Sequence, residues 1–409
     1  MKSKIKTKLN NHYKKYLAKE KYRNRLNSFL FTLWKVLYTI FSLLPVKQNS
    51  VLFVASNDIS VPEEYKSLTE YSKEQGYNIR FIFKSPNTSD VIYKNELKKI
   101  LNDIKFQYYY ARSKATFVCD YFLPCFANNP RKGTKLIQIW HGCGAFKKWG
   151  YSTRSGSWGL RDEFFEKYNV HKTYSLITTS SDFVNDKYAE AFDSDIKKVK
   201  ALGVPRTDVF FNNTFKDSQK NNLYNKYPEL KNKKIVLWAP TYRGNDLKSS
   251  ENPIAINFAL LKEYLGDNFA LLCKFHPHLA NKINTDAISE ETNGFVYNIS
   301  DEFSISSALC FSDILISDYS SLIFEYSLLE KPMIFYAYDL NEYENDRSFY
   351  YDYNDFVPGV IVKSTEDLAK AILTAEKEFN KDKVISFKRK FMSACDGKST
   401  QRIFDYAVK

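Results

Sequence analysis

Glycine is scarce in this 409-residue sequence, which has 13, and its six cysteines form no Cys-x-x-Cys pair and no metal-ligand spacing with the five histidines. Few glycines argue against a chain of long flexible loops. The cysteine spacing argues against a zinc module or a disulfide-stapled secreted domain. We expect the cysteines to be reduced and largely buried in a cytoplasmic protein. They are Cys119, Cys125, Cys143, Cys273, Cys310 and Cys395.

Two common nucleotide-binding signatures are also missing. The sequence has no GxxxxGK[ST] loop and no GxGxxG fingerprint, which argues against P-loop and ordinary dinucleotide enzymes. It shows no DxD motif in its first half of the kind that holds a divalent cation under a diphosphate. We therefore expect no metal and no other cofactor, so a diphosphate would have to be neutralised by helix N-termini, Arg and His.

Acidic residues are nearly absent from the first 25 positions, which hold ten Lys or Arg and one acid, Glu20. This tail carries +9 of the chain's formal net charge of +13. A local basic tail is typical of proteins that bind nucleic acid or an anionic membrane surface. The stretch that follows it favours the membrane.

Phe29 to Leu44 is an apolar stretch closed by Pro45. Polar residues recur in this region every three or four positions, which predicts a helix with one narrow polar stripe. A spanning helix would place Lys35 near mid-bilayer at a cost of about 3 kcal/mol, whereas a helix lying in the interface avoids that cost. We therefore favour an in-plane anchor, with a spanning signal-anchor and a helix packed on the protein's own core as alternatives. The stripe consists of Arg25, Ser28, Thr32, Lys35, Thr39 and Ser42.

From Ser50 onward, short apolar runs alternate with amphipathic stretches. Such alternation predicts parallel, doubly wound sheets, and the length suggests two domains. We predict an α/β protein with a membrane-anchoring segment (1–48), a first Rossmann-like domain (49–215) and a second one (216–409). The expected strands are 51–54, 79–83, 115–118, 135–140 and 175–178 in the first domain, and 235–238, 270–274, 295–297, 314–316, 333–335 and 360–362 in the second.

Histidine, arginine and hydroxyl side chains gather where four of these strands end. The carboxyl ends of parallel strands in two such domains face the cleft between them, so these side chains should lie close together. The four strand ends read His141-Gly142-Cys143-Gly144 followed by Lys147 and Lys148, Ala239-Pro240-Thr241-Tyr242-Arg243, His276-Pro277-His278, and Ser317-Asp318-Tyr319-Ser320-Ser321.

These residue types suit proton transfer and a diphosphate. His141 precedes a Gly-x-Gly turn, which leaves its imidazole exposed and able to take a proton from an attacking hydroxyl. Arg243 has a planar fork suited to phosphate, and His276 and His278 could each donate to phosphate oxygens. The alternatives are histidines that only satisfy local hydrogen bonds and an arginine in a surface ion pair.

The serine-rich stretch suits a phosphate if a helix begins at Asp318 or Ser320. Its first backbone N–H groups and the Ser320 and Ser321 hydroxyls would then face one point beyond the strand. The alternative is a plain helix cap. Cys143 is expected to be a small packing residue, because a cysteine nucleophile would need a covalent intermediate for which nothing else in the sequence argues.

Six motifs, taken in order over roughly residues 50 to 405, resemble the CDP-glycerol glycerophosphotransferase family of teichoic acid synthesis. Two motifs depart from the family pattern: Cys143 and Gly144 stand where a Thr- or Ala-like residue and often Pro are usual, and Ser348 stands where Gly is usual. The motifs are Trp140-His141-Gly142 with the following lysines, Ala239-Pro240-Thr241-Tyr242-Arg243, His276-Pro277-His278, Ser317-Asp318-Tyr319-Ser320-Ser321, Lys331-Pro332-Met333-Ile334-Phe335-Tyr336 with Asp339, and Phe349-Tyr350-Tyr351-Asp352-Tyr353 leading to Pro358-Gly359.

The resemblance implies a metal-independent enzyme of GT-B-like fold, held as a peripheral protein on the cytoplasmic face of the cell membrane. Such enzymes move an alditol phosphate from CDP-glycerol or CDP-ribitol to a hydroxyl of a lipid-linked or polymeric acceptor and release CMP, in teichoic acid or related cell-wall or capsule synthesis. It also implies roles for residues. The catalytic residues would be His141 and His276; the donor-binding residues Arg243, Thr241, His278, Ser317, Asp318, Ser320, Ser321 and Glu325; and the acceptor-side residues Gly142, Lys147 and Lys148.

Two other interpretations are compatible with parts of the sequence. A GT-B glycosyltransferase using a nucleotide sugar would share the fold and the diphosphate site. A non-catalytic protein that binds a membrane or nucleic acid would use the basic tail alone. We expect no nucleic-acid partner, because the charged side chains gather at strand ends and the polar stripe adjoins the tail. The alditol, the acceptor and the oligomeric state stay open.

Overall fold

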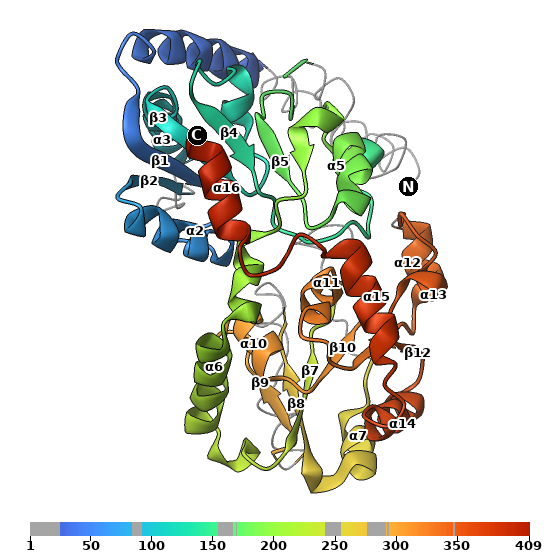
Figure 1. The fold of residues 1–409 in the computed structure, drawn as a ribbon. Coiled ribbons are helices and arrows are strands. Elements are labelled where there is room, and N and C mark those ends of the chain that lie inside the picture. Colours follow the sequence, from blue (N-terminus) through green and yellow to red (C-terminus); the bar gives the residue numbers. More distant parts are fainter. Residues whose placement is uncertain are drawn as a thin grey trace, which may run out of the picture.

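The computed structural model describes residues 25–83, 92–153, 167–168, 170–241, 255–275, 292, 294–346 and 348–409. These ranges form two six-stranded sheets, each entirely parallel. Each sheet belongs to its own domain, and Figure 1 shows the first domain at the top of the view and the second at the bottom. The prediction of two Rossmann-like domains is therefore confirmed. All expected strands are present, and the six cysteines are buried and free, as expected.

The first sheet has the strand order β2-β1-β3-β4-β5-β6. Its last strand, Val199–Lys200, was not expected, because two residues are too short to show a pattern. The strands are β1 (Lys47–Ala55), β2 (Asn78–Phe83), β3 (Ser113–Val118), β4 (Lys135–Gln138), β5 (Leu176–Thr178) and β6 (Val199–Lys200); the helices are α2 (Glu63–Glu74), α3 (Ile92–Tyr110) and α5 (Asn185–Ala191), with 3-10 turns η1 (Leu123–Ala127), η2 (Gly150–Thr153), η3 (Asp182–Val184), η4 (Ile196–Lys198) and η5 (Pro205–Phe211).

The second sheet has the order β12-β11-β10-β7-β8-β9. Helix α6 (Asn213–Lys226) precedes its first strand in the sequence. The strands are β7 (Lys234–Trp238), β8 (Phe269–Cys273), β9 (Val296–Asn298), β10 (Ile314–Ser317), β11 (Met333–Tyr336) and β12 (Val360–Val362); the helices are α6 (Asn213–Lys226), α7 (Phe258–Leu265), α10 (Ile305–Phe311), α11 (Leu322–Ser327), α12 (Leu340–Asp346), α13 (Tyr353–Phe356), α14 (Thr365–Thr374), α15 (Lys381–Phe391) and α16 (Ser399–Val408), with η6 (Pro228–Leu230) and η7 (Gly266–Asn268).

The central strands are buried along nearly their whole length. Every residue of β10 is buried, as are residues 50–55 of β1. This is expected of parallel strands with helices on both faces, and it explains why they read in the sequence as unbroken apolar runs. The carboxyl ends of these strands lead directly into the loops that can meet a ligand.

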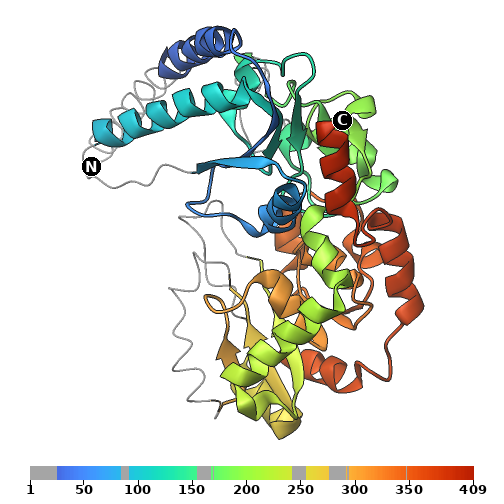
Figure 2. The same ribbon diagram turned by 60° about the vertical axis from the view of Figure 1, so that its left-hand side comes forward.

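Residues 25–41 form a helix that lies beside α3 at the edge of the first domain (Figure 2). One face packs on the protein: Trp34 and Leu30 are buried, Phe31 contacts the Tyr168 ring at 5.2 Å between centroids, and the Tyr38 hydroxyl donates to Asn129 O at 3.1 Å. The packed alternative is therefore correct for this face. Among the described residues, no helix is long and apolar enough to cross a membrane.

The last helix, α16, crosses back to the first domain (Figure 1). Its apolar face, formed by Ile403, Phe404 and Ala407, is buried in the core of the first sheet. The Phe404 ring packs edge-on against Tyr71 and Tyr77, with centroids 5.5 and 5.0 Å apart. The predicted second domain, 216–409, is therefore wrong for this helix, which belongs to the first domain.

Candidate functional site

His141 lies in the loop after β4, where the chain takes an unusual conformation. Trp140 has a φ of 55°, in the left-handed region that bulky residues rarely adopt. Its backbone N–H donates to Gln138 Oε1 at 2.8 Å, and its indole stacks on the His141 imidazole with centroids 4.1 Å apart. Such strained positions gather at functional sites. The His141 side chain that follows Trp140 is 48% exposed.

The contacts of His141 determine which ring nitrogen is available. Nδ1 lies 3.1 Å from the backbone oxygen of Cys119, which can only accept a hydrogen bond. Nδ1 therefore carries the hydrogen, and Nε2 keeps the lone pair that can accept a proton. A carboxylate oxygen of Asp120 lies 4.0 Å from Nδ1 and could stabilise the imidazolium.

Asp120 was not among the predicted site residues. It follows β3, the strand next to β4, and is held by Tyr121 N at 2.6 Å and by the Asn57 amide. The sequence does contain a pattern that points to Asp120, because this residue follows an apolar strand just as His141 does. A single Asp after a strand is too common to be selected without its spatial neighbour.

The turn after His141 is held rigidly by the first domain. Gly142 O accepts from the Tyr188 hydroxyl at 3.1 Å, and Gly144 N donates to Ser180 Oγ at 2.9 Å. Gly144 has a φ of 60°, and a Cβ placed there would overlap the ring of Phe324 in the second domain. Glycine at 144, a departure from the family pattern, is thus required by a close contact between the domains.

Cys143 is buried within this turn, at 3% exposure. Burial raises the pKa of its thiol well above the usual range, and the nearby Glu325 carboxylate raises it further. A thiol in this environment stays protonated and is a poor nucleophile. The interpretation of Cys143 as a packing residue agrees with its surroundings.

The His-Gly turn meets the serine-rich loop of the second domain. A Cβ placed on Gly142 would lie 3.9 Å from Ser321 Oγ, in ordinary contact. The strand ends of both sheets, predicted to face one cleft, therefore come together at this point. His141, Gly142, Ser320 and Ser321 all belong to the two loops that meet here.

Asp318 organises the second-domain loop from within. Its buried carboxylate accepts from Thr241 N at 3.0 Å, from Thr241 Oγ1 at 2.8 Å and from Tyr319 N at 2.6 Å. Thr241 and Asp318, both predicted to bind the donor, are thus adjacent across β7 and β10. The carboxylate points at the loop's own backbone, so its contribution to a ligand would be to hold Thr241 in place.

The helix after this loop begins later than expected. The sequence predicted its start at Asp318 or Ser320, but α11 begins at Leu322, with Ser321 as its N-cap. Ser321 makes no capping hydrogen bond, while Ser320 Oγ accepts from Leu322 N at 3.3 Å. Within the part of the chain that is described, the buried Ser317 Oγ has no partner. The Asp318 carboxylate accepts from Tyr319 N, so this N–H is already satisfied before the helix begins.

Glu325 was predicted to meet a hydroxyl of the donor, and the structure contradicts this. Its side chain is 2% exposed and pairs with Arg206, at 2.6 Å between Oε1 and Nε. Arg206 pairs in turn with Glu64 Oε1 at 2.7 Å. Burial raises the pKa of Glu325, and the guanidinium opposes that shift. The pairing partner lies 119 residues earlier, which no local pattern reveals.

Lys147 and Lys148 lie on a seam between the domains. Lys147 forms an antiparallel bridge with Phe349, and Lys148 N donates to Ser348 O at 3.0 Å. The Lys147 ammonium donates to the Tyr343 hydroxyl at 3.2 Å. Both lysines are therefore close to the meeting loops, and their backbone also joins the two domains.

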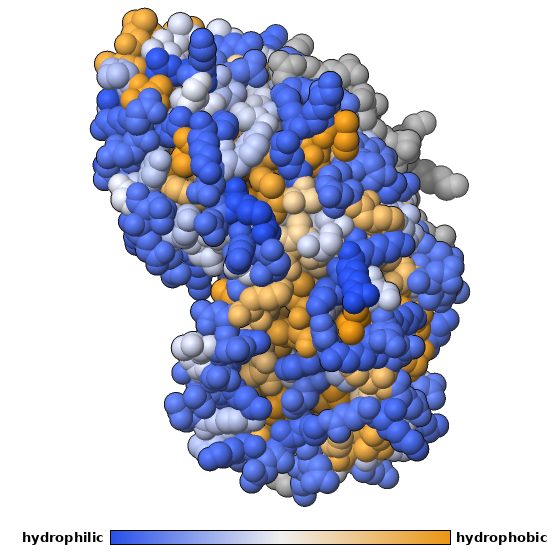
Figure 3. All heavy atoms as spheres, viewed as in Figure 1, coloured by the Kyte–Doolittle hydropathy of each residue, from blue (hydrophilic) through white to orange (hydrophobic). Residues whose placement is uncertain are grey.

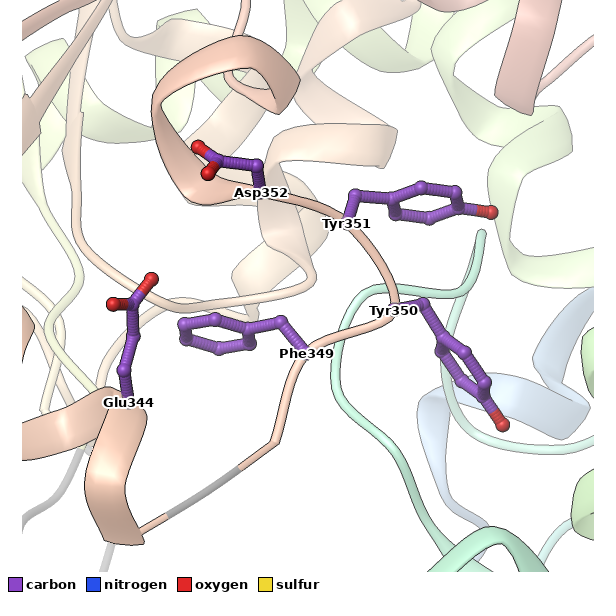
Figure 4. Close-up of a pocket in the computed structure, with 5 residues that line it drawn as sticks. All are labelled: Glu344, Phe349, Tyr350, Tyr351 and Asp352. Carbon is purple, nitrogen blue, oxygen red and sulfur yellow. The ribbon is translucent and has the colours of Figure 1, made fainter.

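A pocket of about 390 Å³ opens beside this seam (Figure 4). The Tyr350 side chain points away from the Phe349 ring, and its hydroxyl donates to Ser152 Oγ at 2.8 Å. Two carboxylates line the pocket, which makes it a poor phosphate site. It is lined by Glu344, Phe349, Tyr350, Tyr351 and Asp352, none of which was predicted as a site residue.

Three predicted residues, Arg243, His276 and His278, lie outside the described residues. Lys274 is described; it directly follows β8 and lies two positions before His276, with its ammonium bound to Ser300 O. Burial lowers the pKa of Lys274. Across the described ranges, no group of three His, Cys, Asp or Glu side chains is placed to hold a metal ion.

The sequence of the whole chain is similar to those of known teichoic acid enzymes. The chain is 36% identical over 387 residues to a teichoic acid poly(ribitol-phosphate) polymerase of Bacillus spizizenii, covering 94% of this chain and 60% of that protein. It is 31% identical over 367 residues to a teichoic acid ribitol-phosphate primase of the same organism, covering 89% and 92%. The chain thus spans less than two thirds of the polymerase and nearly all of the primase.

A solved structure shares the fold. The wall teichoic acid polymerase TagF superposes with a TM-score of 0.76 over 93% of this chain and 97% of that chain, at 22% identity. That likeness supports the GT-B-like arrangement of the two domains. Residues 36–409 match the family described as CDP-Glycerol:Poly(glycerophosphate) glycerophosphotransferase. The resemblance seen in the motifs is confirmed, and the chain belongs to this family.

Proposed function

We propose that the chain transfers ribitol phosphate from CDP-ribitol to a hydroxyl of a lipid-linked or polymeric acceptor, releasing CMP, in teichoic acid synthesis. One observation carries the proposal. The exposed imidazole of His141, with Nδ1 bound to a backbone oxygen, stands where the two domains meet in a chain of this family. An imidazole held in this way has Nε2 available as a base.

The choice of ribitol is supported by the relatives. Four proteins named as ribitol-phosphate polymerases or primases are 31 to 36% identical over 89 to 95% of this chain. Four named as glycerol-phosphate enzymes are 24 to 31% identical. The two ranges meet at 31%, but the three highest identities, 33 to 36%, all belong to ribitol-phosphate polymerases, which favours CDP-ribitol over CDP-glycerol as the donor.

The proposed step is an in-line displacement at the donor's distal phosphorus. The acceptor oxygen forms a bond to that phosphorus, the bridging bond to the proximal phosphate breaks, and CMP leaves. His141 Nε2 takes the acceptor's proton, and Asp120 stabilises the imidazolium. Holding both reactants where the two loops meet supplies the orientation that such a step needs.

Donor binding is proposed for the second-domain loop. The Ser320 and Ser321 hydroxyls can donate to phosphate oxygens, and Asp318 holds Thr241, which follows the neighbouring strand β7. Arg243, His276 and His278 follow the neighbouring strands β7 and β8, and we propose that they neutralise the diphosphate. His276 would stabilise the charge on the leaving phosphate.

We propose that this neutralisation replaces a metal ion. Its basis is the supply of cationic side chains after β7 and β8, where Arg243 and the two histidines stand. Activity should then persist in excess EDTA, and restoration by added Mg²⁺ of activity lost to EDTA would contradict the proposal. On the acceptor side, Gly142 gives close access, and Lys147 and Lys148 would attract the acceptor's phosphates.

We further propose that the outer face of the 25–41 helix binds an anionic membrane surface. Val36 and Ile40 are 51 and 52% exposed and lie four positions apart, on one side of the helix, and Leu43, in the turn after the helix, is 85% exposed. Figure 3 shows apolar atoms gathered at the same edge of the molecule. The basic residues 1–25 precede this face in the sequence and would add electrostatic attraction.

Flotation with vesicles containing anionic lipid tests this surface. Val36→Glu with Ile40→Glu should abolish binding, because both charges would enter the interface. Leu373→Glu is a matched control, since Leu373 is 50% exposed on α14 in the other domain. Equal flotation of the double variant and the control would reject the membrane face.

The transfer itself is tested by CMP release. The full chain is incubated with a lipid-linked acceptor and either CDP-ribitol or CDP-glycerol. We expect release with CDP-ribitol to exceed that with CDP-glycerol. Consumption of a UDP- or GDP-sugar with both CDP-alditols inert would replace the proposal with a GT-B glycosyltransferase.

A further inference from the structure

Arg206 joins the two domains through a buried ion-pair network. It lies in η5, the next element after the first domain's last strand β6, and its side chain is 8% exposed. Its Nε donates to Glu325 Oε1 at 2.6 Å, and Nη1 donates to Glu64 Oε1 at 2.7 Å. Glu325 belongs to α11 of the second domain and Glu64 to α2 of the first. One guanidinium thus bridges a carboxylate from each domain.

The network acts on the helix that carries the serine loop. Helix α11 begins at Leu322, directly after Ser320 and Ser321, and Glu325 follows one turn later. Its neighbour Phe324 is the residue against which Gly144 closes. Two consecutive residues of α11 are therefore held by the first domain, one by packing on the His141 turn and one by Arg206.

The guanidinium of Arg206 can fix the orientation of α11 relative to α2 as well as the distance between them. An arginine fork donates from a rigid plane, so its two bonds set the angle between Glu64 and Glu325. Glu325 Oε2 is buried and has no partner among the described residues, so the carboxylate depends on Arg206. A buried charge that loses its partner is strongly disfavoured, so α11 would shift if the fork were lost.

We propose that Arg206 is a positioning residue for the transfer reaction: it sets the place of Ser320 and Ser321 against His141. It touches neither reactant. The tests that measure kcat rest on the proposed function, whereas the cross-linking test below does not.

The first test is Arg206→Lys, which keeps the charge and loses the fork. We expect kcat to fall about tenfold or more, as a small misplacement of reacting groups does. The dissociation constant for CDP-ribitol, measured by calorimetry, should change less than about twofold, because Asp318 and Thr241 hold the donor loop from within the second domain. A parallel loss of donor affinity would overturn the proposal, since Arg206 would then contact the donor.

The second test separates positioning from stability. Arg206→Met combined with Glu325→Leu replaces the buried pair by apolar side chains, which usually restores stability, and Glu64, 18% exposed, can reach water. We expect the melting temperature to recover while kcat stays low. Recovery of kcat together with the melting temperature would make the network merely structural. Glu330→Gln, which weakens the half-buried pairs of Glu330 with Lys388 and Lys381, is the control and should leave kcat and KM unchanged.

A third readout needs no activity. Gly142→Cys with Ser321→Cys places two thiols across the interface, where a Cβ on residue 142 would lie 3.9 Å from Ser321 Oγ. The native cysteines are all buried, so oxidation should cross-link this pair rapidly. The cross-link should form several times more slowly when Arg206→Lys is added; an unchanged rate would reject the positioning role. If the parent chain releases no CMP from either CDP-alditol, the proposed function fails while this measurement still decides the role of Arg206.

Discussion

The two loops that meet between the domains are built in opposite ways. In the first-domain loop, the side chain of His141 is about half exposed, while the backbone of its neighbours Gly142 and Gly144 is held by Tyr188 and Ser180. In the second-domain loop, the charged side chain of Asp318 faces inward and binds the backbone, which leaves hydroxyls at the surface.

This contrast assigns different tasks to the two domains. A loop that exposes one titratable ring on a rigid support suits proton transfer. A loop that hides its charge and presents neutral donors suits an anionic ligand, since an exposed carboxylate would repel a diphosphate. Under the proposed function each domain would supply half of the site, and the close contact of Gly144 with Phe324 fixes the two loops relative to each other.

The substitution with the largest expected effect is His141→Ala, which tests whether the first-domain loop supplies the base. If the first loop supplies the base, kcat should fall by a factor of about 10³, within the range usual for loss of general-base catalysis. CDP-ribitol should still bind, because the donor loop is untouched. CMP release and calorimetry measure the two quantities; a variant with near-normal kcat would remove His141 from the mechanism.

Gly144→Ala and Gly142→Ala compare two glycines of the same turn. Gly144→Ala should lower the free energy of unfolding by about 2–4 kcal/mol, because the new Cβ combines a strained φ with overlap of Phe324. Gly142→Ala meets only atoms at 3.8 Å or more and should cost under about 1 kcal/mol. Urea unfolding measures both, and equal costs would mean that the close interdomain contact does not constrain residue 144.

The sequence predicted those parts of the molecule whose cause is local. Apolar runs predicted the strands, and residues at the strand ends, such as His141 and Ser321, were brought together because parallel sheets place such ends along one edge. The alternation of polar residues predicted the 25–41 helix. It did not show that Trp34 and Tyr38 would pack on the domain while Val36 and Ile40 stayed outside, because both faces are apolar.

Features that depend on distant partners were missed. The start of α11 was misplaced, and the sequence near it did not show that the Asp318 carboxylate is bound by Thr241, 77 residues away. Glu325 was assigned to the donor because nothing near it in sequence reveals Arg206. The return of α16 to the first domain depends on apolar residues whose partners, such as Tyr77, lie over 300 positions earlier. Such pairings are set by tertiary packing, which local patterns do not encode.

Asp318→Asn tests the inward charge of the second loop. An amide oxygen can still accept from Thr241, but it loses the charge-assisted strength, which is worth about 1–2 kcal/mol. We expect KM for CDP-ribitol to rise about tenfold with a smaller change in kcat. Asp367→Asn on the exposed side of α14 is the control. A large fall in kcat with unchanged KM would place Asp318 in the chemical step and weaken the division of tasks between the loops.

Cys143→Ala should have the smallest effect. It tests whether the first-domain loop supplies a thiol as well as the His141 imidazole. The thiol is buried beside Glu325, and its raised pKa keeps it protonated, so the first loop should use its imidazole and not its sulfur. We expect kcat within about twofold of the parent and a stability loss of about 1 kcal/mol from the small cavity. Loss of CMP release in a folded variant would require a covalent phosphoryl-cysteine intermediate, and the first loop would then supply a nucleophile as well as a base.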